Sequence, residues 1–180
     1  WGNNDKPSTD KMWDIVLTMR IIKNLPPMYG LAVDDAHAYY KYKIGKANPG
    51  RGWVMVKAQQ LNSDQIIASL ESGNFYSSTG VLLNNINQDN KSYVVDISEK
   101  PGITYTTQFI GSTHSINQKD DIDNNEIGKI FYETKTNPAI YNFTGKEIYV
   151  RAKIISDKLQ RNPYSKGDLE MAWTQPLVLK

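Results

Sequence analysis

The stretches Tyr93-Val-Val-Asp-Ile97 and Ile103-Thr-Tyr-Thr-Thr-Gln-Phe109 decide the fold of this chain. Apolar and polar residues partly alternate in both, and a period of two is typical of half-buried antiparallel strands. Clusters of Asn, Asp, Gly and Pro separate these stretches from other β-rich runs, as turns do. The other runs lie at residues 80–87, 129–135, 138–143, 148–156 and 170–179. The pattern predicts an antiparallel, Ig-like β-sandwich over residues 76–180.

Residues 1–75 have a different pattern. Apolar residues three or four positions apart predict a helix that begins at Thr9 or Asp10 and ends near Lys23. The uninterrupted apolar run at residues 28–34 then predicts a strand that is buried on both faces, as in a parallel sheet.

A second parallel strand is expected at residues 53–58, and Asn62 is placed to cap a second helix that ends at Gly73. Two helices that alternate with two strands are typical of a parallel α/β layer. The sequence therefore predicts an α+β chain with two parts, an α/β part at residues 1–75 and a β-sandwich at residues 76–180.

The triplet Asp35-Ala36-His37 stands at the end of the first expected strand. Residues i and i+2 of an extended segment project to one face, so Asp35 and His37 should point together while Asp34 points away. Carboxylate and imidazole groups are ligands of zinc, manganese and iron. Asp35 and His37 are therefore candidate metal ligands, with Asp34 as a supporting residue or a loop cap. The alternative is a solvated strand end without a metal.

Several motifs occur in one order and at one spacing. They are Met12-Trp13-Asp14, Tyr29 to His37, Gly52 to Val56, and Leu70 to Gly80. On these motifs the chain resembles the C-terminal half of the polymerase-and-histidinol-phosphatase (PHP) family of metal-dependent phosphoesterases. The resemblance covers residues 12–80 and is looser beyond them. There it is limited to Tyr149-Val-Arg151-Ala and to Ala172-Trp173 followed by Pro176.

The resemblance implies that residues 1–75 are the last part of a PHP-type α/β barrel and that Asp35 and His37 are its last metal ligands. It also implies a divalent zinc, manganese or iron ion and a small phosphorylated substrate, whose identity the sequence does not give. The family supplies further ligands through an H-x-H motif, but the two histidines of this chain are His37 and His114.

A catalytic zinc needs about three protein ligands, so this ligand set is incomplete. Either the missing ligands lie upstream of Trp1, in an N-terminal half of the same protein, or the chain holds no metal. Because the sequence begins with Trp rather than Met, we expect a processed or trimmed fragment that is inactive alone.

Composition narrows the choice of partners. A net charge of +2, with acidic and basic residues interspersed, gives no basic stripe, so a nucleic-acid partner is not expected. No apolar run is long enough for a membrane span. The absence of Cys excludes a disulfide framework and a thiolate nucleophile but does not fix the compartment. The Asn-, Ser-, Thr- and Tyr-rich sandwich suggests an exported, bacterial-type protein, and the compartment stays open.

A second interpretation makes the β-sandwich the functional part. It would be a non-catalytic binding or accessory module for a glycan or another protein, with some of the 11 Tyr and 4 Trp as a stacking platform. In sandwiches, however, aromatic residues more often form the core.

Two other sequence features can each be interpreted as a binding site or as an ordinary solvated loop. The cations Lys41, Lys43, Lys46 and Arg51 could attract an anion or be solvated, and the stretch from Asp120 to Glu126 resembles a calcium loop without the EF-hand glycine.

Overall fold

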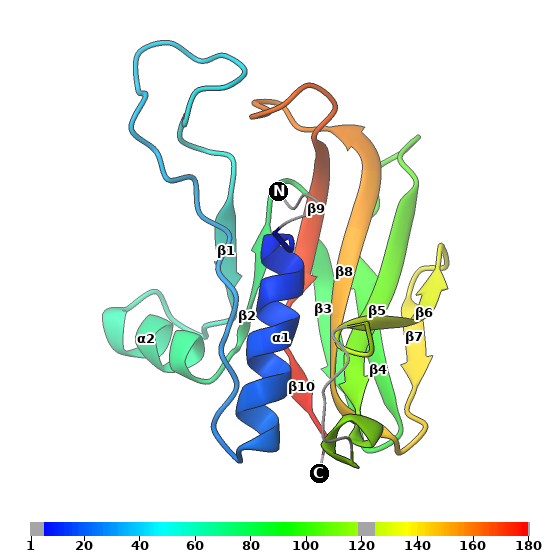
Figure 1. Ribbon diagram of the computed structural model, residues 1–180. Helices are drawn as coiled ribbons and strands as arrows, with labels where there is room; N and C mark the ends of the chain where they lie inside the picture. Colours follow the sequence, from blue (N-terminus) through cyan, green and yellow to red (C-terminus); the bar gives the residue numbers. More distant parts are fainter. Residues whose placement is uncertain (1–5, 119–124, 180) are drawn as a thin grey trace.

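The computed structural model describes residues 6–118 and 125–179, and most of the calcium-like stretch that begins at Asp120 lies outside them. Within these residues the chain forms two α-helices, one 3₁₀ turn and ten strands (Figure 1). The helical elements are α1 (Thr9–Ile22), α2 (Ser63–Glu71) and η1 (His114–Gln118). The strands are β1 (Trp53–Val56), β2 (Phe75–Ser78), β3 (Leu83–Gln88), β4 (Ser92–Ile97), β5 (Tyr105–Thr113), β6 (Lys129–Thr134), β7 (Ala139–Asn142), β8 (Glu147–Leu159), β9 (Leu169–Thr174) and β10 (Leu177–Val178).

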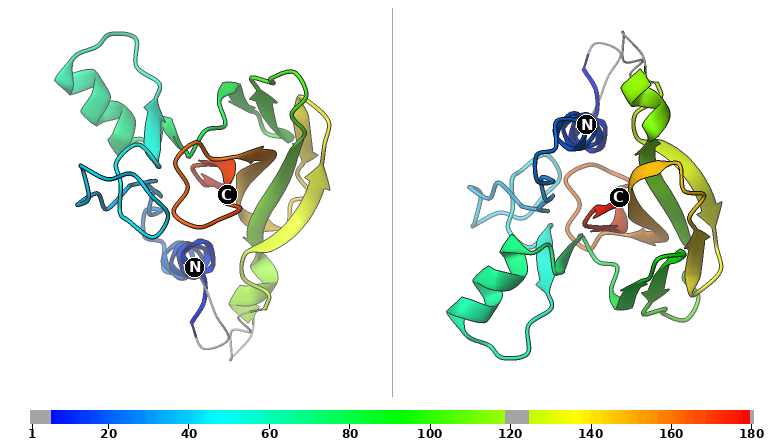
Figure 2. Two further views of the ribbon diagram at one scale, coloured as in Figure 1. Left: turned by 90° about the horizontal axis from the view of Figure 1, so that it is seen from above. Right: turned by 90° about the horizontal axis from the view of Figure 1, so that it is seen from below.

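The strands form two antiparallel sheets that face each other (Figure 2). The larger sheet has the order β1-β2-β9-β8-β5-β6, with β10 paired to β8, and the smaller sheet has the order β3-β4-β7. Each of the seven predicted β-rich runs contains a strand. The α+β class and a sandwich-like arrangement of sheets are therefore confirmed. No helix among the described residues is long and apolar enough to cross a bilayer.

Aromatic rings fill the space between the sheets. Tyr93 and Tyr141 of the smaller sheet pack against Phe109 of the larger one, with ring centroids 5.9 Å and 5.5 Å apart. Phe109 is fully buried, and both tyrosines are also buried. These rings are core residues, because edge-to-face and offset contacts of this kind stabilise the packing of facing sheets. They are not available as an exposed stacking platform.

Strand β8 is buried on both faces. Its residues Val150, Ala152 and Ile154 pack between the sheets. The alternate residues Tyr149 and Arg151 face α1 instead, where they contact one carboxylate. Because side chains of a strand alternate between faces, this single strand joins the sandwich core to the helix layer.

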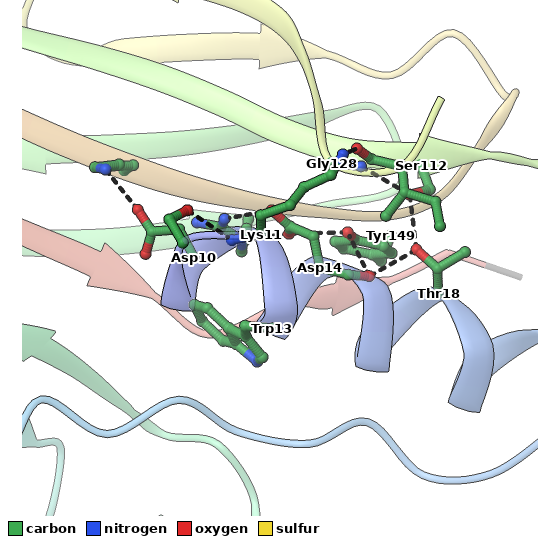
Figure 3. Close-up of polar contacts among 12 residues, drawn as sticks. Asp10, Lys11, Trp13, Asp14, Thr18, Ser112, Gly128 and Tyr149 are labelled. Atoms are coloured by element: carbon green, nitrogen blue, oxygen red, sulfur yellow. Dashed lines mark hydrogen bonds and ion pairs between the residues drawn. The ribbon is translucent and has the colours of Figure 1, made fainter. Parts of the chain in front are cut away.

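A buried ion pair holds α1 against β8 (Figure 3). Arg151 Nε and Nη2 donate to the two carboxylate oxygens of Asp14 at 2.8 Å and 2.7 Å, and the Tyr149 hydroxyl donates to the same carboxylate at 2.9 Å. The side chains of Arg151 and Asp14 are 1% and 4% exposed. The Trp13 ring lies 4.7 Å from the guanidinium carbon of Arg151. The two partners lie 137 positions apart in the sequence.

Gly128 leaves room for this ion pair. A Cβ at this position would lie 2.5 Å from Asp14 Oδ2, and its φ of +62° also favours glycine. The Gly128 N–H donates to Ser112 Oγ, which lies 2.8 Å from Thr18 Oγ1 of α1. The loop before β6, the strand β5 and the helix therefore meet around one carboxylate.

Two predictions for the first part of the chain are wrong. Residues 28–34 form no strand, because they are paired with none of the described strands. The expected parallel pair is also absent, since β1 pairs antiparallel with β2. The apolar run misled the prediction because alternate side chains of the run face outward rather than being covered on both faces.

Smaller differences concern element ends. Ser8 rather than Thr9 or Asp10 caps α1, by accepting the Lys11 N–H. Asn62 caps α2 as predicted, by accepting the Gln65 N–H.

β2 begins at the predicted boundary and lies between β1 and β9. The larger sheet therefore contains strands from both sides of residue 75. The division into residues 1–75 and 76–180 stays a prediction.

We expect Asp14→Asn to lower the free energy of unfolding by about 3 kcal/mol, because Arg151 would keep its charge in a buried place without a counter-charge. Urea unfolding followed by tryptophan fluorescence measures the change. Glu126→Gln is the control, since the Glu126–Lys129 pair is exposed and should contribute less than about 1 kcal/mol. Similar losses in both variants would contradict a special role of the buried pair.

Glu147 should contribute an acid-sensitive part of the stability. Its buried carboxylate accepts the Tyr141 hydroxyl at 2.5 Å and the Thr144 N–H and hydroxyl at 2.9 Å and 2.8 Å. Burial alone would raise the pKa of Glu147, but these hydrogen bonds lower it from 4.5 to about 2. The stabilisation is therefore present above pH 4.5 and is lost as the pH falls towards 2.

The measurement is the free energy of unfolding of the wild-type chain and of Glu147→Gln at several pH values across this window. We expect stability to fall less steeply with acid in the variant, because the variant has no carboxylate to protonate at this position. Parallel curves for the two proteins would contradict the assignment.

Candidate functional site

The segment that carries the predicted metal ligands runs from Met28 to Ala38 along the outside of the larger sheet (Figure 1). Side-chain exposure alternates from residue 31 to residue 37, with the odd-numbered residues exposed and the even-numbered ones half-buried. Asp35 and His37 are therefore exposed, and Asp34 is half-buried.

Asp34 closes the loop that follows it. Its carboxylate accepts the backbone N–H groups of Gly50, Arg51 and Gly52 at 2.7 Å, 2.7 Å and 2.6 Å. The two ends of the loop at residues 35–49 are thereby joined through one side chain. This is the loop-cap role, since a carboxylate that accepts several N–H groups stabilises a fixed chain path.

The backbone of Asp35 orients the ring of His37. Asp35 has a φ of +48°, a left-handed conformation that Asp tolerates better than most residues. Its carbonyl oxygen lies 2.7 Å from His37 Nδ1. Because a carbonyl can only accept, Nδ1 carries a proton in this contact, and in the neutral ring Nε2 then has the lone pair. Nε2 has no hydrogen-bond partner among the described residues, so it is the ring nitrogen available to a ligand.

Arg51 has a structural role, although the sequence placed it among the cations that could attract an anion. It is 9% exposed and donates to the carbonyl oxygens of Asn162 and Pro163 at 2.8 Å and 3.1 Å, and also to those of Lys43 and Lys46. These contacts join the loop at residues 35–49 to the loop between β8 and β9. The long sequence separation of the partners left no local pattern from which this role could be predicted.

The candidate residues share a pocket. Asp34, Asp35 and His37 line a pocket of about 530 Å³ together with Lys46 and Tyr164. Lys46 is therefore the cation of this pocket, and Tyr164 is a lining residue that the sequence did not indicate. The remaining members of the pocket wall are Ala38, Gly45 and Ala47.

A second pocket of about 590 Å³ is formed by the same two loops. It contains Lys43 and Arg161 together with Tyr42 and Pro163. The loop at residues 35–49 and the loop between β8 and β9 thus form both hollows, and basic side chains reach each of them.

The described residues do not complete a metal site. Among them, no three or more His, Asp or Glu side chains gather closely enough to hold an ion. η1, which begins at His114, lies at the opposite end of the molecule from the loop at residues 35–49 (Figure 1). Asp35 and His37 therefore offer two donors, and the second histidine does not join them.

Comparison of the chain with known protein families, with curated proteins and with solved structures finds no match.

Neighbouring aspartates provide a sharp test of the loop. We expect Asp34→Asn to lower the free energy of unfolding by about 1–2 kcal/mol and to speed hydrogen exchange at the amides of residues 50–52, because their carboxylate acceptor is changed. Asp35→Asn is the matched control, with an expected change within about 0.5 kcal/mol, since Asp35 is exposed and Asn also tolerates its backbone conformation. Equal exchange rates in the two variants would show that Asp34 does not close the loop.

Proposed function

We propose that this chain supplies Asp35 and His37 as the last ligand pair of a divalent-metal centre in a PHP-like phosphoesterase. The remaining ligands come from a further polypeptide segment, which the family resemblance implies is an N-terminal part of the same protein. The observation that carries the proposal is that the exposed residues Asp35 and His37 line one pocket together with Lys46, and that His37 Nε2 has no partner among the described residues.

Asp35 and His37 are suitable as two of the ligands of a divalent-metal centre. The ring of His37 is held through Nδ1 by a backbone carbonyl, an arrangement that is usual for histidines that bind a metal through the other nitrogen. A carboxylate two residues away adds an oxygen donor, and the N and O pair suits zinc, manganese or iron. Two donors are too few for a hydrolytic site, so the chain alone should be inactive.

The residues around the ligand pair have definable roles. Asp34 fixes the start of the loop, so that Asp35 and His37 keep their orientation. Lys46 gives the pocket a positive charge that attracts a phosphate ester. A divalent ion, when bound, lowers the pKa of a coordinated water and polarises the phosphoryl oxygen. The alternative of a glycan-binding sandwich has less support, because Tyr93, Phe109 and Tyr141 are buried in the core.

A Mn²⁺ titration of the ¹⁵N-labelled chain tests the ligand pair. We expect paramagnetic broadening to affect the signals of Asp35 and His37 first, because the ion binds between their side chains. In His37→Gln the affinity for Mn²⁺ should fall at least tenfold, and in His114→Gln it should be unchanged. Broadening that is centred elsewhere, or that persists in His37→Gln, would contradict the proposal.

A further inference from the structure

The segment at residues 28–34 has one bonded edge and one open edge. On the bonded edge, the Gly30 N–H donates to Gln175 Oε1 and the Ala32 N–H donates to Ser77 Oγ, both at 2.9 Å. The Gly30 carbonyl oxygen also accepts hydrogen bonds from the Ser77 hydroxyl and the Gln175 side-chain amide. Side chains therefore take the place of a neighbouring strand along this edge.

The open edge belongs to the alternate residues. The backbone N–H and C=O groups of Leu31 and Val33 have no hydrogen-bond partner in the described parts of the chain. In an extended segment the polar groups of successive residues point to opposite sides, so the free groups of these two residues face away from the bonded edge. Free groups at every second residue are the pattern that a β-strand presents to its next neighbour.

The side chains at this open edge are large and apolar. Leu31 and Val33 are 59% and 73% exposed. The inward positions are small by contrast, since a Cβ on Gly30 would lie 2.9 Å from the Trp13 ring. The segment therefore sits tightly on the molecule while its bulky side chains remain uncovered.

Among the other edge strands, β3 and β6 are protected by polar or charged side chains, whereas β1 and β7 carry no charged residue. β3 carries several Asn and Gln residues, and β6 carries Lys129 and Glu133. Polar and charged side chains discourage the pairing of an edge with another strand. Residues 28–33 contain no charged residue.

We propose that the open edge at Leu31 and Val33 is a docking edge for one β-strand of another polypeptide, with apolar side chains at alternate positions. The alternating free N–H and C=O groups require a partner that offers acceptors and donors at the same interval, which an extended backbone does. The exposed Leu31 and Val33 side chains require apolar neighbours on that strand.

The docking edge leads directly to Asp35 and His37. A strand that pairs with Leu31 and Val33 comes close to the pocket, so it is also placed to deliver the missing ligands. This last step rests on the proposed function, whereas the docking itself is argued from main-chain groups and does not need a metal.

The test uses a displayed library of ten-residue peptides that alternate apolar with variable residues, selected on the immobilised chain. The selected peptide is synthesised, and its dissociation constant is measured by fluorescence anisotropy. We expect Val33→Pro to weaken binding at least tenfold, because it removes an N–H that the chain itself does not use. Val33→Thr keeps this N–H and the branched shape, and should weaken binding less than threefold.

Hydrogen exchange of the unmodified chain gives an independent result if Val33→Pro fails to fold. On peptide binding, the amides of Leu31 and Val33 should become protected, while those of Gly30 and Ala32 should not change. Protection at β1 or β6 instead, or failure to select a peptide, would overturn the proposal. Dimerisation of the chain alone through this edge would also overturn it, by identifying a second copy as the partner. Peptide binding without Mn²⁺ binding would retain the docking edge and reject the proposed function.

Discussion

The buried ion pair between Asp14 and Arg151 is the interaction on which the rest of the arrangement depends. Removing both charges from water is costly, and the cost is offset only where the two groups meet in good geometry. The bidentate contact therefore fixes both the rotation and the position of α1 on β8. Because the opposite face of β8 forms the sandwich core, the same strand ties the helix to both sheets.

The candidate site is built outward from this helix. Trp13, beside the ion pair, packs against Gly30, and its Nε1 donates to the Met28 carbonyl at 2.8 Å. These contacts hold the extended segment at residues 28–34 against the molecule. Asp34 then closes the loop at residues 35–49. The orientation of Asp35 and His37 is thus a consequence of contacts that begin at α1.

The extended segment connects the proposed docking edge at Leu31 and Val33 with the proposed ligands Asp35 and His37. Its exposed side carries apolar residues first and the carboxylate and imidazole after them. A partner strand would be recognised by main-chain groups at the apolar end, and a metal would be held at the polar end. Docking of a partner strand on this one segment would therefore also complete the metal site. Both proposals together would account for the exposed apolar side chains that lie beside only two metal ligands, Asp35 and His37.

Local pattern determined much of this protein. Alternation and turn residues predicted strands β3 to β10, and Asn62 predicted the start of α2. Only the tertiary structure decided that residues 28–34 pair with no described strand, that Arg51 is buried among carbonyl groups, and that Asp14 meets Arg151. The physical reason is range: periodicity and capping act between neighbours, whereas burial and ion pairing depend on distant residues such as Asp14 and Arg151, which lie 137 positions apart.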